Sequence, residues 1–417
     1  MSQMLEQLRW PPDPWVVGEF PNRRSHSFGS AGMGHVHAAA LAAHPTRPLY
    51  VSGSSTGRIY LWQFGDATCK AAYVPITSSQ LQSAPRRLAL HEAVTTPHWG
   101  SPAALRFSRS GGRFGAVGEG GLVGLWRQDF ISAVDGLGHA EWVGRCLSRA
   151  GTALTFLGDT GSQVLVGGVD DRGGAVVLVD TLAPPSSARA AQLLSPRGTT
   201  PSALTLVPGG AGASGAAPGA VLVVGDDAGE LRGFDVRLLS EARPLWSVKP
   251  HTAAGLPAAA VTCVACWDPG MVGGSSGMSA SGGGGGGSDC TSYSGSAAAF
   301  LPRSWLGDLV VSGGRDGSIA VVNAHTGTTL QLLQLAHYTE RRGLLERVVG
   351  SSASRAGGAS LEDGGPLLRV RPASAVAAAV TDVAATGEGL VSVGADGVAR
   401  FHPLAHLLNH WAGDNDY

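Results

Sequence analysis

Short apolar runs rich in β-branched residues recur along the chain, and glycine-containing turns separate them. The clearest pair is Val310–Val311 and Ile319–Val322, with Arg315-Asp316-Gly317 between them. An Asp-Gly turn between two such runs is a strong local signal for a β-hairpin. The pattern therefore predicts two strands joined by a tight turn at this place.

The same hairpin recurs in a constant register. The turn glycines are Gly57, Gly121, Gly174, Gly229, Gly317 and Gly397, and the position six residues after each of them closes the second strand in every copy. Repeats that combine short strands with turns in this way are typical of β-propellers, in which each repeat forms one four-stranded blade. Because a single blade cannot bury both of its faces, the blades have to stack in a ring.

These hairpins resemble the WD40 repeat, in which Ser-x-Asp-Gly precedes a strand that ends in Trp-Asp. No copy keeps an intact Trp-Asp pair, since the corresponding residues include Trp62-Gln63, Trp126-Arg127 and Phe234-Asp235. The resemblance implies an all-β, WD40-type propeller with six recognisable blades. A seventh blade could be assembled from residues 10–33 and the C-terminal tail, where only one strand is obvious.

We expect residues 34–403 to form the propeller, between an N-terminal extension (1–33) and a tail (404–417). Six blades of about 40–45 residues need about 250–270 residues, so the rest of the 417-residue chain has to lie in tails and insertions. Insertions are expected at about residues 75–98, 209–219, 270–299 and 351–365. The last three are rich in Gly, Ala and Ser, and such tracts bury too little apolar surface to offset the entropy of ordering, so they should be flexible loops.

The position of the strands within each blade also follows from the pattern. The insertions in blades four and five fall between the first two strands, so we expect one rim of the ring to carry variable loops and the other to keep the tight turns. The outer strand of blade two is expected over His139–Cys146.

We expect partners to bind at the tight-turn rim, because rigid turns lose less entropy on docking than long loops. The individual contact residues are not predicted.

Composition excludes several classes of function. The net charge is −1, which gives no electrostatic footprint for nucleic acid. The five cysteines are odd in number and scattered, as is typical of reduced thiols in the cytoplasm. The first residues do not read as a signal peptide, and no apolar run approaches the ~18 residues of a membrane span. We therefore expect a cytoplasmic protein without an integral membrane segment.

The motifs of several enzyme classes fail on inspection. Gly53-Ser-Ser-Thr-Gly57 matches the hydrolase elbow, but that elbow needs a following helix, and Arg58–Trp62 reads as a strand. Neither lysine lies in a Gly-Lys-Ser/Thr phosphate loop. Cys263 and Cys266 have redox or zinc spacing, yet on a strand they point to opposite faces and no second pair completes a tetrahedral site. No catalytic, cofactor or metal residue is therefore predicted, and the protein is not expected to be an enzyme. The alternative is a propeller hydrolase or lyase with its site in the central channel.

Two histidines are the remaining candidates. His251 and His337 each precede the inner strand of a blade. WD40 repeats often place a histidine there, linked through a serine to the turn aspartate, and the matching residues are Ser312 with Asp316 and Ser392 with Asp396. The resemblance implies a structural hydrogen-bond network, in which Asp316 supports His251 through Ser312.

Several segments resemble one family more closely. They are Gly32–Val36, His44–Tyr50, Gly53–Trp62, Leu105–Gly115, Asp180–Pro185, Val311–Arg315 and Ser392–Gly397. In this order they resemble the C-terminal propeller of rabconnectin-3/DmX-like proteins, over residues 32–403. The Gly/Ala/Ser-rich insertions depart from the family pattern, and the usual family chain is several times longer.

This resemblance implies a non-catalytic scaffold that promotes assembly of the vacuolar-type proton pump (V-ATPase), as the central subunit of the RAVE complex does in fungi. It implies a role in vacuolar and endosomal acidification, with pump subunits and RAVE-like proteins as partners and a peripheral location on endosomal or vacuolar membranes. The alternative is a WD40 adaptor of another complex, either a substrate receptor of a ubiquitin ligase or a vesicle-coat or trafficking subunit. No cofactor is implied.

Overall fold

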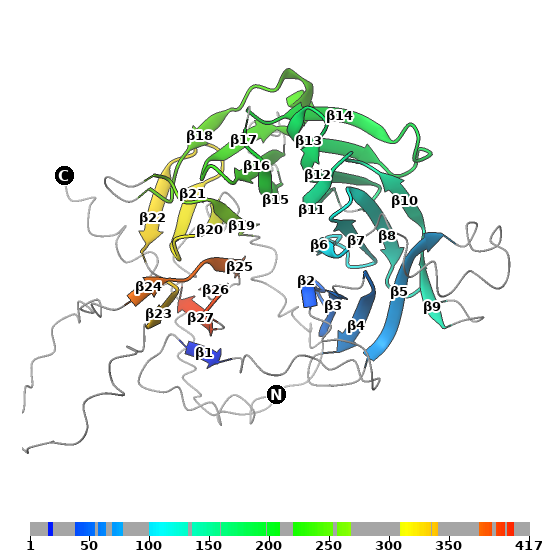
Figure 1. Cartoon of the computed structure of the whole chain (residues 1–417), viewed down its shortest axis with the longest axis horizontal. Helices are drawn as coiled ribbons and strands as arrows, with labels where there is room; N and C mark the ends of the chain where they lie inside the picture. Colours follow the sequence, from blue (N-terminus) through cyan, green and yellow to red (C-terminus); the bar gives the residue numbers. More distant parts are fainter. Residues whose placement is uncertain are drawn as a thin grey trace, which may run out of the picture.

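The computed structural model of the chain describes residues 16–19, 38–77, 100–208, 220–267, 309–340 and 375–403, apart from short gaps within these ranges. Most of the expected insertion residues, together with the tail at 404–417, lie outside the described residues. The described part is almost entirely β-structure, with one 3-10 helix, η2 (Val236–Glu241). Six antiparallel sheets stand around one axis (Figure 1), so the predicted six-bladed propeller is confirmed.

Each of the first three blades contains four antiparallel strands. They follow one another along the chain, except that in blade two a further short strand comes between the third and fourth strands. They are β2 (Ala38–Ala43), β3 (Leu49–Ser54), β4 (Ile59–Gln63) and β5 (Cys69–Thr77); β6 (Pro102–Phe107), β7 (Arg113–Gly118), β8 (Leu122–Arg127) and β10 (Trp142–Arg145); and β11 (Ala150–Leu157), β12 (Gln163–Asp170), β13 (Gly173–Asp180) and β14 (Arg189–Leu194). The first strand named in each set is the inner strand, nearest the axis (Figure 1).

The other three blades follow the same plan, except that the last takes its outer strand from the N-terminal region. They contain β15 (Pro201–Val207), β16 (Val221–Asp226), β17 (Leu231–Asp235) and β18 (Trp246–Val248); β19 (Val261–Cys266), β20 (Leu309–Gly314), β21 (Ile319–Asn323) and β22 (Thr329–Leu333); and β25 (Val380–Ala385), β26 (Gly389–Gly394), β27 (Val398–Pro403) and β1 (Val16–Glu19). β1 pairs antiparallel with β27, so the expected N-terminal extension contains a strand of blade six.

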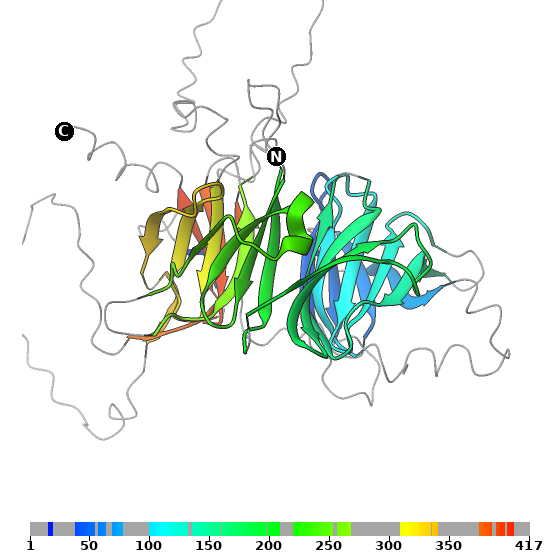
Figure 2. The ribbon, with the colours of Figure 1, turned by 90° about the horizontal axis from the view of Figure 1, so that it is seen from above.

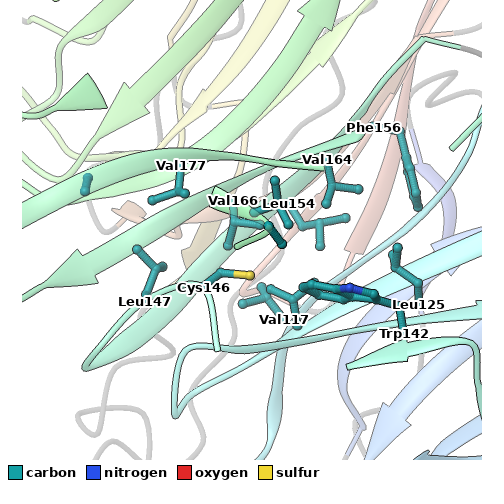
Figure 3. Close-up of a cluster of buried hydrophobic side chains, with 14 residues drawn as sticks. Val117, Leu125, Trp142, Cys146, Leu147, Leu154, Phe156, Val164, Val166 and Val177 are labelled. Atoms are coloured by element: carbon teal, nitrogen blue, oxygen red, sulfur yellow. The ribbon is translucent and has the colours of Figure 1, made fainter. Parts of the chain in front are cut away.

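The blades bury both faces because they stack against each other. Their middle strands are therefore continuously apolar rather than alternating, and every residue of β16 and β20 is buried. Figure 3 shows the seam between blades two and three, where Leu125 and Trp142 face Leu154 and Val166. The strands cross the thickness of the disc from one rim to the other (Figure 2).

Tryptophans tie neighbouring blades through their indole N–H groups. Trp126 Nε1 of blade two donates to the carbonyl oxygen of Val74 in blade one at 2.9 Å. Trp246 Nε1 of blade four donates to Ala324 O beside blade five at 2.6 Å. An indole N–H is a donor only, and burying it without an acceptor costs free energy. These bonds therefore satisfy the buried indoles and fix the spacing of the blades.

The expected outer strand of blade two is divided between two blades. β9 (Leu137–Ala140) pairs in parallel with β5 of blade one, whereas β10 pairs with β8 of blade two. Gly138 allows this, since a Cβ atom at that position would lie 2.0 Å from the Tyr73 ring. The prediction that His139 begins the outer strand of blade two is therefore wrong.

Two rims of the disc can now be defined. The turn rim carries the connections between the second and third strands of each blade, and the far rim carries those between the first and second and between the third and outer strands. The connection from β22 to β25 contains the pair β23 (Tyr338–Glu340) and β24 (Ala375–Ala377), and His337 N donates to the turn residue Gly317 at 3.0 Å. The connection that contains residues 341–374 therefore begins and ends at the turn rim, in addition to the insertions of blades four and five that the sequence assigns to the opposite rim.

Candidate functional site

The first predicted network lies at the turn rim of blade five. His251 comes between β18 and β19, Ser312 lies on β20, and Asp316 lies in the turn after β20. His251 Nε2 is 2.9 Å from Ser312 Oγ, and Nδ1 is 2.7 Å from Ser318 Oγ. Ser318 Oγ is 2.6 Å from Asp316 Oδ1. The structure thus brings the three predicted residues together, but Asp316 reaches His251 through Ser318 and not through Ser312.

The hydrogen bonds of this network assign the ring protons. Asp316 accepts from both the amide and the hydroxyl of Ser318, so the Ser318 oxygen is free to accept from His251 Nδ1–H. His251 Nε2 then accepts from the Ser312 hydroxyl. Burial lowers the pKa of His251 to about 4, against the opposing effect of the Asp316 charge. The ring is therefore neutral, and each of its nitrogens has one partner.

The second predicted network lies at the turn rim of blade six. His337 Nε2 is 2.9 Å from Ser392 Oγ, and Nδ1 is 3.0 Å from Asp396 Oδ1. Here the carboxylate contacts the ring directly. Ser392 Oγ is also 3.0 Å from His402 Nε2. The Ser392 hydroxyl thus joins the Nε2 atoms of both rings, and Nδ1 of His337 faces Asp396, so each of these side chains has a polar partner.

Arg400 completes this second network. Its guanidinium lies 2.6 Å from Asp396 Oδ2 and also contacts the His337 ring. Burial alone would raise the pKa of Asp396, but the hydrogen bonds from Arg400 and His337 outweigh it and lower that pKa. Burial lowers the pKa of His337, and it lowers the pKa of His402 to about 4. The carboxylate is therefore ionised beside two neutral rings.

Sequence reasoning missed three members of these networks: Ser318, Arg400 and His402. A signal for His402 was present in the register, because Trp62 holds the equivalent place in blade one and donates through Nε1 to Ser52 Oγ at 2.8 Å. His402 makes the same contact with Ser392. Ser318 follows the Asp-Gly turn directly, but its rotation toward His251 depends on the blade being assembled.

In blades three and four, an arginine pairs with an aspartate at the turn rim, where blades five and six use a histidine. Asp226 ends β16, is fully buried, and lies 2.7 Å from the Arg232 guanidinium. Asp170 ends β12 and accepts from the Ser148 amide at 3.0 Å and from Arg189 at 3.3 Å. Burial would raise the pKa of Asp170, but the hydrogen bonds from Ser148 and Arg189 lower it to about 2. Aspartates at the end of the second strand therefore organise the turn rim.

The order Ser392–His337–Asp396 is that of the hydrolase catalytic relay, in which a histidine removes the proton of a serine nucleophile. Catalysis requires that a substrate reach the serine oxygen in an open pocket. Ser392, His337 and Ser312 are each 0% exposed, and His251 is 1% exposed. The geometry therefore provides rigidity at the turn rim, since buried polar groups that are fully paired hold their neighbours in one arrangement.

If the protein were an enzyme, its active site would be expected in the central channel. A cavity of about 370 Å³ opens there near the ends of the inner strands, and its wall includes Phe107, Phe156, Leu206 and Arg106. Among the described residues, no group of three or more His, Cys, Asp or Glu could hold a metal ion. The cavity wall thus presents mainly apolar side chains and backbone.

The two cysteines with redox spacing lie on β19. Cys263 is buried, and burial raises the pKa of its thiol to about 12. Cys266 lies on the same strand at the wall of the channel cavity. The Gly-x-Ser-x-Gly segment is followed by the strand β4 and not by a helix, so it lacks the geometry of a nucleophile elbow.

Within the described part of the chain, no helix has the length and apolar character needed to cross a membrane. No family model matches the sequence, and no curated protein matches it.

Solved structures do match the fold. The crystal structure of Chaetomium thermophilum Sqt1 is 15% identical with a TM-score of 0.51, and the match covers 90% of this chain and 71% of that one. A chain of the mitotic checkpoint complex is 12% identical with a TM-score of 0.50, over 88% and 75% of the two chains. The WD40 propeller domain of Doa1 is 9% identical with a TM-score of 0.49, over 89% and 79%. At these identities the likeness shows the fold alone, and that fold is the six-bladed β-propeller described above.

Proposed function

We propose that the chain is a non-catalytic scaffold domain that binds other proteins, acting as the C-terminal propeller of a rabconnectin/DmX-like protein in assembly of the vacuolar proton pump. The observation that carries the scaffold role is the burial of both Ser–His–Asp networks, whose reactive atoms are satisfied inside the fold. The specific role rests on the ordered segments that resemble the family; those within the described residues belong to blades one, two, three, five and six. It places the protein in the cytoplasm, peripheral to vacuolar or endosomal membranes.

The surface that binds partners is also part of the proposal. The turn rim was favoured because its turns are tight, but residues 341–374 leave from that rim. Leu194 is exposed near the turn rim, but three large exposed apolar side chains lie on the far rim, in the connections after the third strands of blades two, three and four. They are Phe130, Leu182 and Leu238, which are 51%, 78% and 47% exposed. Exposed apolar side chains on neighbouring loops favour protein binding, so we assign the partner surface to the far rim.

The loop around Leu182 is held firmly enough to present that side chain. Leu182 N donates to Asp180 Oδ1 at 3.0 Å, and Thr181 N donates to Ser162 O at 2.8 Å. A loop that is fixed before binding loses little entropy when a partner docks. Leu182 is therefore the single best position at which to test the surface.

Affinity purification of the tagged full chain from its source cell, followed by mass spectrometry, tests the function. Pump subunits and RAVE-like proteins should co-purify, and cells that lack the gene should acidify their vacuoles poorly. Leu182→Asp should reduce that recovery, whereas the matched turn-rim variant Arg315→Glu should not. Recovery of ubiquitin-ligase or coat subunits, with normal vacuolar pH in the knockout, would replace the pump role by the adaptor alternative. Stoichiometric zinc or calcium in the purified protein would favour an enzyme.

A further inference from the structure

The ring has one seam that differs from the other five. Neighbouring inner strands pack against each other between β2 and β6, β6 and β11, β11 and β15, β15 and β19, and β19 and β25. β25 and β2 stand apart across the remaining seam, between blades six and one (Figure 1). The side chains on both sides of this seam show the consequence.

Blade one presents an exposed leucine to the seam. The bulged register of the inner strands aligns Leu41 with Leu105, Leu154, Leu204, Val264 and Val383. Those five side chains pack against the preceding blade and are at most 5% exposed, whereas Leu41 is 52% exposed. A leucine at the one position that is buried in every other blade indicates a contact that the described residues do not supply.

Blade six presents a matching apolar face. Val391 and Phe401 are cross-strand partners on β26 and β27. The equivalent pair in blade five, Val311 and Val321, is 0% and 6% exposed because blade six covers it. Val391 and Phe401 are only partly buried. Both walls of the seam therefore show apolar groups that a neighbour covers elsewhere in the ring.

At one inner-strand position blade six carries a carboxylate where the other described blades have small apolar residues. Asp382 takes the place held by Cys263, Ala203 and Ala153 in blades five, four and three, where the side chain is small, apolar and buried. Burial raises the pKa of Asp382 against the opposing effect of the Arg106 charge, so a carboxylate occupies a position where the other blades make an apolar contact. Blades six and one are therefore not built to close on each other in the manner of the other pairs.

The residues that follow β27 are candidates to fill this seam. In other blades the third strand continues into the outer strand, but in blade six β1 holds that place, so residues 404–417 are not needed there. They begin directly after β27, two residues beyond His402 on the strand that carries Phe401. Their large apolar residues, at i, i+3, i+4 and i+7, are Leu404, Leu407, Leu408 and Trp411. This spacing is typical of one apolar face of a short helix.

We propose that the C-terminal tail, residues 404–417, docks in the seam between blades six and one and covers Leu41, Val391 and Phe401. A helical segment of eight residues spans about 12 Å, enough to lie along much of a six-residue strand. The connecting segment 20–37 is the less suitable occupant, because it has two arginines and three histidines, and its large apolar residues do not follow the spacing i, i+3, i+4 and i+7. The inference is independent of the proposed function.

A double-mutant cycle in the full chain tests this contact. Leu41→Ala and Leu408→Ser are made singly and together, and Tm is measured for each. If the two side chains touch, each single change should lower Tm by a few degrees, and the double variant should lower it by less than the sum. Leu182→Ala, an exposed leucine remote from the seam, should shift Tm little and add to either change.

Hydrogen exchange supplies a second readout. Leu408→Ser should speed amide exchange in β2 and β26 but leave β12 and β16 unchanged. Strict additivity of Leu41→Ala and Leu408→Ser, with unchanged exchange in β26, would overturn the proposal. So would coupling of Leu41 to Phe28→Ser, which would assign the seam to the connecting segment, or a concentration-dependent dimer whose dissociation exposes β26, which would assign it to a second copy.

Discussion

Thr262 and Val380 join two blades at the wall of the central channel. Thr262 Oγ1, on the inner strand of blade five, lies 2.5 Å from the carbonyl oxygen of Val380 in blade six and 2.9 Å from Gly313 O in its own blade. Thr152 and Ser202 make the same pair of contacts, to Gly167 and Pro201 and to Gly225 and Val261. Each of these residues sits at a bulge in its inner strand. One hydroxyl thus links successive inner strands.

Thr262→Val should lower the free energy of unfolding by about 1–2 kcal/mol, because it leaves carbonyl oxygens unpaired at nearly unchanged volume. Urea denaturation measures the change. Thr381→Val is the matched control, since Thr381 Oγ1 is described only with Val393 O of its own blade, and it should cost less. Equal losses in the two variants would show that the inter-blade contact contributes nothing.

The buried histidines predict a loss of stability in mild acid. Burial lowers the pKa of His251 and of His402 to about 4, whereas an unfolded histidine titrates near pH 6.5. Stability is therefore complete above about pH 6.5 and is lost as the pH falls toward 4, because the unfolded chain binds more protons in that window.

Each ring should contribute about 2 kcal/mol less at pH 5 than at pH 7. Thermal unfolding across this range measures the effect. His402→Asn keeps a donor near Ser392 but does not titrate, so its Tm should change less with pH than that of the parent chain. A Tm independent of pH between 7 and 5 in the parent chain would refute the interpretation.

Asp226 and Arg232 form a buried ion pair, so removing one partner should destabilise the protein more than removing both. Asp226→Ala leaves the Arg232 guanidinium buried without its partner, and such a loss costs about 3–5 kcal/mol. Asp226→Ala combined with Arg232→Met removes both charges and should recover much of that loss. Denaturant unfolding of the two variants provides the comparison. A double variant no more stable than Asp226→Ala would show that the pair matters through shape and not through charge.

Asp316 and Ser318 should behave largely as one unit, because the hydrogen bonds from Asp316 to His251 run through Ser318, while the direct distance from Asp316 Oδ1 to His251 Nδ1 is 4.0 Å. Asp316→Ala and Ser318→Ala should each lower Tm, and combining them should add little to the larger single effect. Ser312→Ala acts on the other ring nitrogen, so it should add to either. If Asp316→Ala and Ser312→Ala proved non-additive while Ser318→Ala was silent, the path first expected from the sequence would be restored.

Deleting Gly273 to Gly295 should leave the propeller folded. Trp267 N donates to Leu309 O at 2.9 Å, so the two ends of this connection are already held together by blade five. Shortening a loop between fixed ends changes its closure entropy only slowly. The measurement is Tm together with the yield of monomer, and loss of folded monomer would contradict the prediction.

The sequence was informative where the deciding interactions are local. The hairpin around Asp316 and Gly317 could be predicted because a glycine with φ of +76° at position 317 is a requirement of the turn itself. The pairing of β1 with β27, and of β9 with β5, could not be predicted in this way. These contacts join residues far apart in the chain, and any free strand edge of suitable length could accept either segment until the blades are placed.

The candidate networks show the same difference between local and long-range interactions. His251 with Ser312 and His337 with Ser392 followed from their fixed place in the repeat. The link through Ser318 depends on a side-chain rotation that only the assembled blade defines. The place of Arg400 is held by Arg232 in blade four, which also pairs with a rim aspartate, but by Ala320 in blade five, so the repeat gives only a weak signal for it. Its pairing with Asp396 had to be seen in the structure.

The division of residues 137–145 between two blades has a consequence for synthesis. During translation the outer edge of blade one, strand β5, stays unpaired until β9 has been made, after all of β6, β7 and β8. An unpaired strand edge is a template for wrong pairing with other chains. Ribosome-bound chains that end before residue 137 should therefore need protection at this edge, and those that extend past residue 145 should not.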